Sequence, residues 1–212
     1  MGSRGKLRWN NSEVRHLRHR IKINDFQRKV LIGLILGDGC LTKNVSDKNF
    51  RLQVEQSAKR KNYLFWLFDI FASWSLSTPR YINAHNSWRF RTITHPEVTS
   101  LRVLFYPKGV KIVPTGIDKF LISTLSLAIW FMDDGNGRKD ARAYSISTHS
   151  FSKRENELLI NCLKKNFNLR ANLNWDAKGN RIYIPTTEAK RFESLVLPFI
   201  LPSMRYKFPL TP

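Results

Sequence analysis

One apolar motif occurs twice in the chain, and each copy ends in an aspartate followed by a glycine. The first copy, LIGLILGDG, spans residues 31–39, and the second, LAIWFMDDG, begins 96 residues later at residue 127. The equivalent acids are Asp38 and Asp134. An apolar run of helical length predicts a buried helix, and a repeat at this distance predicts two similar halves.

The net charge of the chain narrows the class of partner. Its 212 residues contain 36 Lys and Arg against 16 Asp and Glu, a formal charge of +20. A protein this basic generally binds a polyanion, and nucleic acid is the first candidate. An anionic membrane surface is the weaker alternative, since no apolar run approaches the length of a membrane span. Cys40 and Cys162 match neither a metal-binding spacing nor a disulfide framework, which suits a reducing compartment.

Two glycines in the first motif indicate how its helix is used. Asn24 or Asp25 is placed to cap a helix that continues through the motif. Gly33 and Gly37 lie four residues apart and therefore share one face of that helix. Because glycine costs a helix interior about 1 kcal/mol relative to alanine, a second backbone packed on that face best explains the pair. The alternative is that both glycines are incidental.

Alternating and helical segments follow each motif in the same order. The expected pattern in each half is helix, strands, helix, strands, helix, an α+β fold with antiparallel sheets. The first half contains strands at 49–55 and 87–93 and helices at 63–74 and 97–106; the second contains strands at 143–148, 172–175 and 181–184 and helices at 153–167 and 187–197. We therefore expect one half over residues 25–118 and the other over residues 119–212.

The segment before the first motif is strongly basic. Residues 1–24 contain seven Lys or Arg and a single acid, Glu13, without the apolar core of a secretory signal. We expect a basic arm that lies along phosphates. A partly disordered tail and a cleaved organelle transit peptide are the alternatives.

Polar side chains occupy one side of the predicted strands. An open face of an antiparallel sheet is commonly just solvated. These side chains, however, are of the types that bind base edges and phosphates, and a two-stranded ribbon fits the major groove of DNA. The candidate DNA contacts are Arg51, Gln53, Glu55, Arg80, Arg89, Arg91, Ser145, Ser147, His149, Arg181 and Tyr183. For His149, a base contact or a plain surface position is favoured over a catalytic role.

The paired acids point to a metal-dependent reaction. If the two motif helices pack side by side, Asp38 and Asp134 meet at the same end of the pair. Adjacent carboxylates repel each other and require a cation, and oxygen ligands favour Mg²⁺. The carbonyl oxygens of the last helical turn are also free to face an ion. Two acids beside a polyanion-binding surface indicate phosphodiester hydrolysis in which bound ions activate water and stabilise the leaving oxygen.

A lysine follows each acid at the same distance. Lys111 in KIVP lies 73 residues after Asp38, and Lys207 in YKFP lies 73 residues after Asp134. Each lysine is placed to steer or polarise the attacking water, or to stabilise the pentavalent phosphate. In a chain with 36 Lys and Arg, coincidence is the alternative.

The four motifs, in this order and at these spacings, resemble the LAGLIDADG homing endonucleases in their single-chain form with two motifs. The resemblance covers the chain from about residue 25 to its end. It implies two αββαββα halves related by a pseudo-two-fold axis, with the motif helices at the interface and the sheets forming a saddle over DNA. It also implies that Asp38 and Asp134 bind divalent metal together with backbone oxygens of Gly37 and Asp133.

The resemblance further implies an activity. A monomer of this family binds double-stranded DNA and cuts both strands across the minor groove at a long asymmetric site, leaving 3′ overhangs and promoting intron mobility. Lys111 and Lys207 would lie near the scissile phosphates. Mg²⁺ or Mn²⁺ would support cleavage, and Ca²⁺ would support binding alone. Introns of this kind lie mostly in organelles, which implies a mitochondrial or chloroplast protein that is encoded there.

Two departures from the family pattern are present. The sixth motif position, often acidic in the family, is Leu36 in one copy and Met132 in the other. The second motif also lacks the glycine pair and has Ile129 and Asp133 at those positions, so the helix contact is expected to be asymmetric. Neither departure removes a catalytic acid.

Two other functions compete with the nuclease. Some family members bind RNA as maturases that assist the splicing of their own intron, instead of or in addition to cutting DNA. The other alternative is a DNA-binding protein that has lost catalysis. The retention of both acids and both lysines argues against an inactive binder, because binding alone does not need them.

Overall fold

Two similar halves, each with one four-stranded sheet, form the computed structural model, which describes residues 11–43, 47–177 and 179–208. A short helix, α1 (Asn11–Arg20), precedes them. The first half runs through α2 (Asp25–Leu36), β1 (Cys40–Lys43), β2 (Phe50–Ser57), α3 (Lys61–Ile70), β3 (Arg80–Ile82), β4 (Ser87–Arg91) and α4 (Pro96–Phe105). The second half runs through α5 (Thr124–Asp134), β5 (Gly135–Gly137), β6 (Tyr144–Ile146), α6 (Lys153–Phe167), β7 (Asn172–Asp176), β8 (Gly179–Ile184) and α7 (Thr186–Val196).

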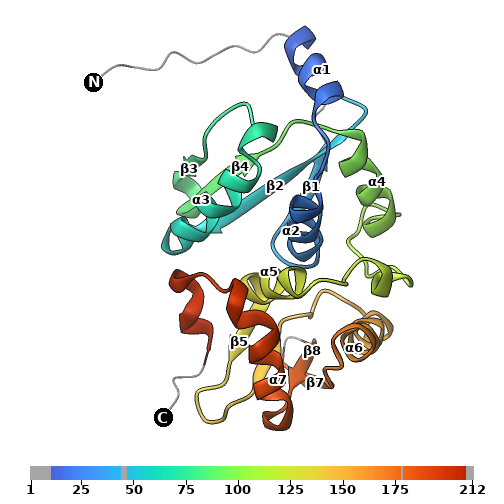
Figure 1. Cartoon of the computed structure of the whole chain (residues 1–212), viewed down its shortest axis with the longest axis vertical. Coiled ribbons are helices and arrows are strands. Elements are labelled where there is room, and N and C mark those ends of the chain that lie inside the picture. The colour runs from blue at the N-terminus through green and yellow to red at the C-terminus, as the bar shows by residue number, and fades with distance from the viewer. Residues whose placement is uncertain (1–10, 44–46, 178, 209–212) are drawn as a thin grey trace.

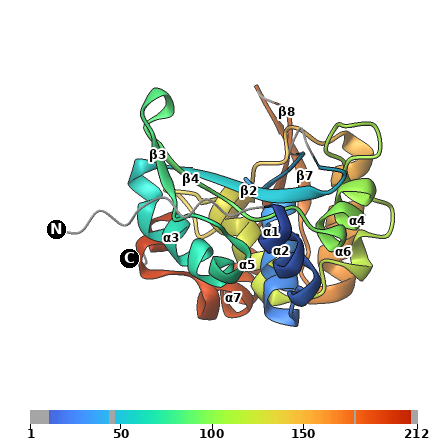
Figure 2. The same ribbon diagram turned by 90° about the horizontal axis from the view of Figure 1, so that it is seen from above.

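The two sheets share one topology. Their strand orders are β1-β2-β4-β3 and β5-β6-β8-β7, and all neighbouring strands are antiparallel. Figure 1 shows one half on either side of α2 and α5, and Figure 2 shows α2, α5 and α7 along one side of the molecule with strands of both sheets along the other. The predicted α+β architecture and the order of elements in each half are confirmed.

Helices α2 and α5 pack against each other at the centre of the molecule. A Cβ atom added at Gly33 would lie 2.5 Å from the carbonyl oxygen of Ser126 and 2.6 Å from the Cβ of Ile129. One added at Gly37 would lie 2.4 Å from a carboxylate oxygen of Asp133. The larger side chains of α5 therefore fill the space that the glycines of α2 leave, and the contact is asymmetric as the sequence predicts.

Capping interactions fix where α2 begins and ends. The Asn24 side chain accepts a hydrogen bond from the backbone of Gln27 (2.8 Å), and the Gln27 side chain accepts one from the backbone of Asn24 (3.2 Å). This reciprocal pair satisfies two of the amides that a helix start leaves free. At the other end the amide of Gly37 donates to the carbonyl of Gly33 (3.0 Å). Asp38 consequently emerges just beyond the last turn.

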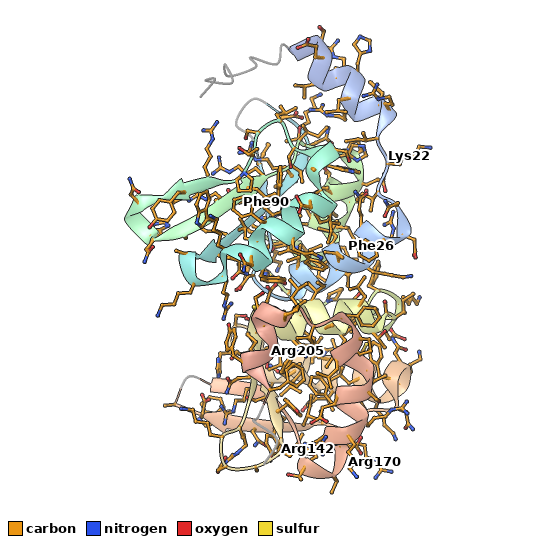
Figure 3. All side chains as sticks on the ribbon, turned by 60° about the vertical axis from the view of Figure 1, so that its left-hand side comes forward. Lys22, Phe26, Phe90, Arg142, Arg170 and Arg205 are labelled. Carbon is orange, nitrogen blue, oxygen red and sulfur yellow. The ribbon has the colours of Figure 1, made fainter. Side chains whose placement is uncertain are left out.

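Aromatic side chains form the core beneath each sheet. Phe90 of β4, labelled in Figure 3, is buried and packs edge-on against Phe68 of α3, with ring centroids 5.8 Å apart. In the second half, Phe192 of α7 packs against Phe131 of α5 (4.9 Å) and against Tyr144 of β6 (4.7 Å). Through these contacts the helices pack against one face of each sheet. The opposite face of each sheet is not covered by these helices.

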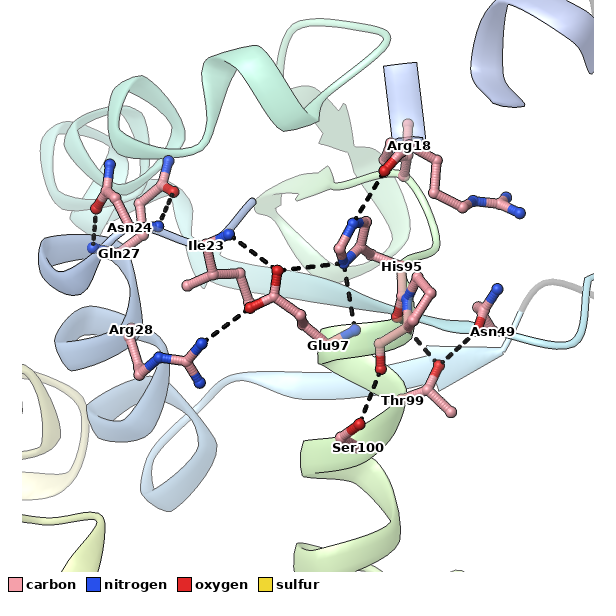
Figure 4. A network of polar contacts seen from close by, with 12 residues as sticks. Arg18, Ile23, Asn24, Gln27, Arg28, Asn49, His95, Glu97, Thr99 and Ser100 are labelled. Atoms are coloured by element: carbon pink, nitrogen blue, oxygen red, sulfur yellow. Dashed lines mark hydrogen bonds and ion pairs between the residues drawn. The ribbon is translucent and has the colours of Figure 1, made fainter. Parts of the chain in front are cut away.

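The described part of the basic N-terminal segment forms helix α1, which is tied to the first half through Arg18. The Arg18 side chain donates to the carbonyl oxygen of Thr94 (2.8 Å) and forms an ion pair with Asp47. The carbonyl of Arg18 in turn contacts the His95 ring (3.1 Å), and Glu97 accepts a hydrogen bond from the backbone of Ile23 (3.2 Å) (Figure 4). Residues 1–10 of the predicted arm lie outside the described residues.

The hairpin between β7 and β8 is tighter than the sequence predicts. The predicted strands 172–175 and 181–184 leave residues 176–180 for the turn, yet Asp176 already pairs with Gly179, and Trp175 pairs with Asn180. Gly179 has a φ of 120°, which side-chain-bearing residues rarely adopt, and this lets the chain reverse early. Lys178 lies outside the described residues. Within the described part of the chain, no helix combines the length and apolar character needed to cross a membrane.

Candidate functional site

The ends of α2 and α5 bring Asp38 and Asp134 into one electrostatic environment. Burial, and then the negative charge of Asp38, raise the pKa of Asp134 to about 7, even though the nearby ammonium groups of Lys111 and Lys207 oppose this shift. A carboxyl group whose pKa is shifted to near 7 by burial and a neighbouring charge is typical of a functional site. The structure thus brings together all four predicted catalytic residues.

Asp133 contributes its side chain to the site as well as its backbone. One carboxylate oxygen accepts a hydrogen bond from the amide of Asp38 (3.0 Å), and the other accepts one from the side-chain amide of Gln56 (3.2 Å). The same Gln56 nitrogen donates to Asp38 (2.9 Å). Burial raises the pKa of Asp133 well above its usual range, and the charge of Asp38 adds to this rise. Gln56, which the sequence does not single out, therefore links two acids from different halves.

Arg60 is a second residue that the sequence does not single out. Its guanidinium lies 3.5 Å from the carboxylate of Asp38, donates to the side-chain oxygen of Gln56 (3.2 Å) and lies 3.4 Å from the carbonyl oxygen of Asp133. The position 96 residues later holds Asn156, which is buried and bonded within its own half. Within the described residues, the second half therefore supplies no arginine equivalent to Arg60.

The two predicted lysines reach the ends of the motif helices. Lys111 comes from the segment between α4 and α5, and Lys207 comes from the segment that follows α7. Lys111 Nζ donates to the carbonyl oxygens of Gly37 (2.7 Å) and Gly39 (3.2 Å). Burial lowers the pKa of Lys111, although the surrounding acids oppose this shift. Lys207 lies in the 3₁₀ helix Pro202–Lys207, and its Nζ donates to the carbonyl oxygens of Asp133 (2.9 Å) and Gly135 (2.8 Å). Burial, and then the charge of Arg60, lower the pKa of Lys207 to about 8.

The oxygen atoms of the site suit a hard divalent cation. Two carboxylates, Asp38 and Asp134, share a site in which one of them is destabilised by the other, and a cation relieves this repulsion. The carbonyl oxygens of Gly37 and Asp133 lie at the ends of the two motif helices, and each already accepts a hydrogen bond from a lysine. Among the described residues, no group of three or more His, Cys, Asp and Glu side chains is arranged to hold a metal. A metal here would therefore rely on two carboxylates plus backbone, water or substrate oxygens.

The first sheet presents all six of its predicted DNA contacts on its open face. Arg91 stands opposite Gln53, and Arg89 stands opposite both Glu55 and Arg80. Glu55 is not free: it accepts hydrogen bonds from Arg89 (2.7 Å), from the Ser87 hydroxyl and from the His85 ring. Burial raises the pKa of Glu55, but these bonds outweigh it and lower the pKa to about 2. Arg51 is the remaining predicted contact on this face.

The second sheet places its predicted contacts less uniformly. Ser145 and Tyr183 stand opposite each other on the open face. Arg181 forms an ion pair with Asp176 (3.2 Å), which also lies 3.2 Å from the His149 ring. Ser147 lies past the end of β6, where its amide donates to the carbonyl oxygen of Asp134 (3.0 Å). The backbone of Ser147 is thus attached to the end of α5, and its side chain is exposed.

Comparison with known proteins identifies this arrangement. A model described as the LAGLIDADG DNA endonuclease family matches residues 28–192. This chain belongs to the LAGLIDADG DNA endonuclease family. The resemblance predicted from the four motifs is confirmed.

Similar proteins include endonucleases and a maturase. The probable intron-encoded endonuclease 1 of Wickerhamomyces canadensis is 33% identical over 197 residues, which span 87% of this chain and 84% of that protein. The cytochrome b mRNA maturase bI2 of Debaryomyces hansenii is 27% identical over 191 residues, spanning 84% of this chain and 72% of that protein. The solved structure of the homing endonuclease I-WcaI bound to its DNA recognition sequence matches with a TM-score of 0.86 at 30% identity, over 96% of this chain and 95% of that one.

Proposed function

We propose that this LAGLIDADG protein is a monomeric homing endonuclease that cuts both strands of a long asymmetric DNA site. Cleavage requires Mg²⁺ or Mn²⁺ and leaves 3′ overhangs. The double-strand break promotes the mobility of the intron that encodes the protein. The observation that carries this proposal is that each half has one acid and one lysine in equivalent places. Lys111 and Lys207 contact equivalent carbonyls at the ends of the helices that bear Asp38 and Asp134. The likeness to I-WcaI, which was solved with its DNA recognition sequence, supports the same partner for this chain.

In the proposed reaction the chain supplies charge and orientation. Asp38 and Asp134 hold the divalent ion, together with carbonyl oxygens of Gly37 and Asp133. When bound, the ion lowers the pKa of water and stabilises charge on the leaving oxygen. Hydrogen bonds to backbone carbonyls hold the ammonium groups of Lys111 and Lys207 in place. Their positive charges are therefore positioned before the phosphate binds.

The proposed DNA contacts divide between the two halves, residues 25–118 and residues 119–212. Those of the first half are Arg51, Gln53, Glu55, Arg80, Arg89 and Arg91, and those of the second are Ser145, Ser147, His149, Arg181 and Tyr183. The basic arm, residues 1–24, extends this surface along the phosphates. Relatives described as an intron-encoded endonuclease and a cytochrome b mRNA maturase support expression in an organelle.

Plasmid cleavage tests the proposed activity. A plasmid that carries the intron-free allele of the host gene is incubated with the protein in Mg²⁺, in EDTA and in Ca²⁺. We expect linearisation in Mg²⁺ alone and binding without cleavage in Ca²⁺. Asp38→Asn and Asp134→Asn should abolish cutting and keep binding, whereas Asp140→Asn, which changes an exposed acid paired with Arg138, should cut normally. Absence of linear product in Mg²⁺ would refute the nuclease.

A maturase is the second candidate function, because the similar protein of Debaryomyces hansenii is described as one. It predicts tight binding to the chain's own intron RNA and faster splicing of that RNA in vitro. Asp38→Asn separates the two activities, since splicing does not need the metal-binding acid. Splicing at an unchanged rate in the presence of the protein would exclude this function.

A further inference from the structure

The open faces of the two sheets differ in chemistry. Within the described residues, the face of the first sheet carries four arginines, one acid and one glutamine, namely Arg51, Arg80, Arg89, Arg91, Glu55 and Gln53. The face of the second sheet, within the described residues, carries three asparagines, one arginine and one acid, namely Asn136, Asn172, Asn174, Arg181 and Asp176. One face is therefore strongly basic, and the other is nearly neutral and rich in amides.

The arginines of the first face are held in a way that leaves their ends available. Arg91 donates through Nε to the side-chain oxygen of Gln53 (2.6 Å), and Arg89 donates through Nε to Glu55 (2.7 Å). Within the described residues, neither arginine uses its two terminal amino groups in another hydrogen bond. A guanidinium fixed through Nε loses little rotamer freedom on binding, and its terminal fork matches the O6 and N7 acceptors of guanine.

The asparagines of the second face present the complementary chemistry. Asn172 and Asn174 lie on β7, opposite Tyr183 and Arg181, and within the described residues neither side chain has a hydrogen-bond partner. A side-chain amide offers one donor and one acceptor side by side, which matches N7 and N6 of adenine. Arg181 on the same face is balanced by Asp176 at 3.2 Å, so it adds little net charge.

From this contrast we infer that the DNA target is asymmetric in base composition. The half-site under β1–β4 is rich in guanine, read by Arg89 and Arg91. The half-site under β5–β8 is rich in adenine, read by Asn172 and Asn174. This inference rests on the proposed function, because it requires that the open faces contact base edges of a DNA site.

Selection from random duplex DNA tests the inference. The full chain carrying Asp38→Asn, which keeps bound DNA intact, is used to enrich a random pool long enough to span both sheets. We expect a site with guanine concentrated in one half and adenine in the other. An enriched site with the same composition in both halves overturns the inference and leaves the proposed function standing. Failure to enrich any site overturns both.

Variants then assign each half-site to a sheet and separate base contacts from phosphate contacts. Arg91→Ala should lower the preference for guanine at a position of the guanine-rich half by roughly 5- to 150-fold, and Asn174→Ala should do the same for adenine in the other half. Arg91→Lys is the matched control, because it keeps the charge and loses the planar fork. If Arg91→Ala keeps the guanine preference, or weakens binding to every sequence equally, the arginine does not read guanine and the inference is wrong.

Discussion

Lys111 and Lys207 occupy equivalent positions at the ends of the two motif helices. Lys111 Nζ lies 2.7 Å from the carbonyl oxygen of Gly37, and Lys207 Nζ lies 2.9 Å from that of Asp133, which is 96 residues further along the chain. The backbone of the site therefore follows the two-fold repeat, even where side chains such as Arg60 and Asn156 differ between the halves. In the proposed reaction, each DNA strand would therefore meet one acid and one lysine.

Removing one lysine should slow the cleavage of one strand more than the other. We expect Lys207→Met to lower the rate by roughly 10²-fold, the usual cost of losing one positioned group that stabilises the transition state. Supercoiled plasmid should then accumulate as nicked circles before it becomes linear. Lys108→Met, which changes an exposed lysine three residues before Lys111, is the control and should cut at the wild-type rate. Equal slowing of both strands would show that the lysine serves a shared step.

Gln56 should act as a positioning residue for the first acid. It donates to both Asp38 (2.9 Å) and Asp133 (3.2 Å), so Gln56→Leu removes the bridge between two carboxylates. Loss of such an orienting partner typically costs 10- to 100-fold in metal affinity or activity, about the effect we expect on the cleavage rate. Raising the Mg²⁺ concentration should recover part of the rate. A rate equal to that of the wild type at all Mg²⁺ concentrations would show that Asp38 needs no such support.

The contact between α2 and α5 should be intolerant of even one methyl group. Gly33→Ala would place its Cβ 2.5 Å from the carbonyl oxygen of Ser126, and we expect it to lower the free energy of unfolding by roughly 1–3 kcal/mol. At Gly116 a Cβ would meet nothing closer than Lys119 at 4.0 Å. Gly116→Ala is therefore the matched control, with an expected change below about 1 kcal/mol. Urea unfolding of both variants checks this, and equal losses would mean that the helices separate easily.

The sequence predicts the helices of both halves and the longer strands from local patterns, and it predicts the two-fold frame from the 96-residue repeat, but it gives no bounds for α1, β1, β3 or β5. Apolar runs, caps and alternation place the motif helices and the faces of the strands within a few residues. It also predicts that Gly33 and Gly37 meet larger residues, since the repeat aligns them with Ile129 and Asp133. What it misses are contacts that depend on how the two halves are packed together.

Gln56 illustrates this limit. It follows Phe50, Leu52 and Val54 at the same spacing of two, so a polar residue at a core position was the one available signal. Its partner Asp133 lies 77 residues away on another helix, and no local pattern connects them. Likewise, alternation places Arg89 and Glu55 on one face, but only the register of β2 against β4 shows that they are paired.

Glu193 should make the stability of the second half depend on acid pH. Its buried carboxylate accepts hydrogen bonds from Arg142 (2.8 Å) at the outer end of this half (Figure 3) and from the Tyr144 hydroxyl. The bonds from Arg142 lower the pKa of Glu193 below its usual value of 4.5. A lowered pKa in the folded state adds stability that is fully present above 4.5 and is lost as the pH falls through the folded value.

The difference between the wild type and Glu193→Gln measures this contribution. We expect the variant to be less stable by roughly 1–3 kcal/mol near neutral pH, because two donors lose a charged acceptor. The gap should shrink once the pH drops below 4.5. Glu97→Gln is the control: it is the equivalent position 96 residues earlier, and its side chain is 30% exposed, against 11% for Glu193. Urea unfolding at several pH values checks both variants, and a gap for Glu193→Gln that stays constant into acid would show that its charge does not stabilise the fold.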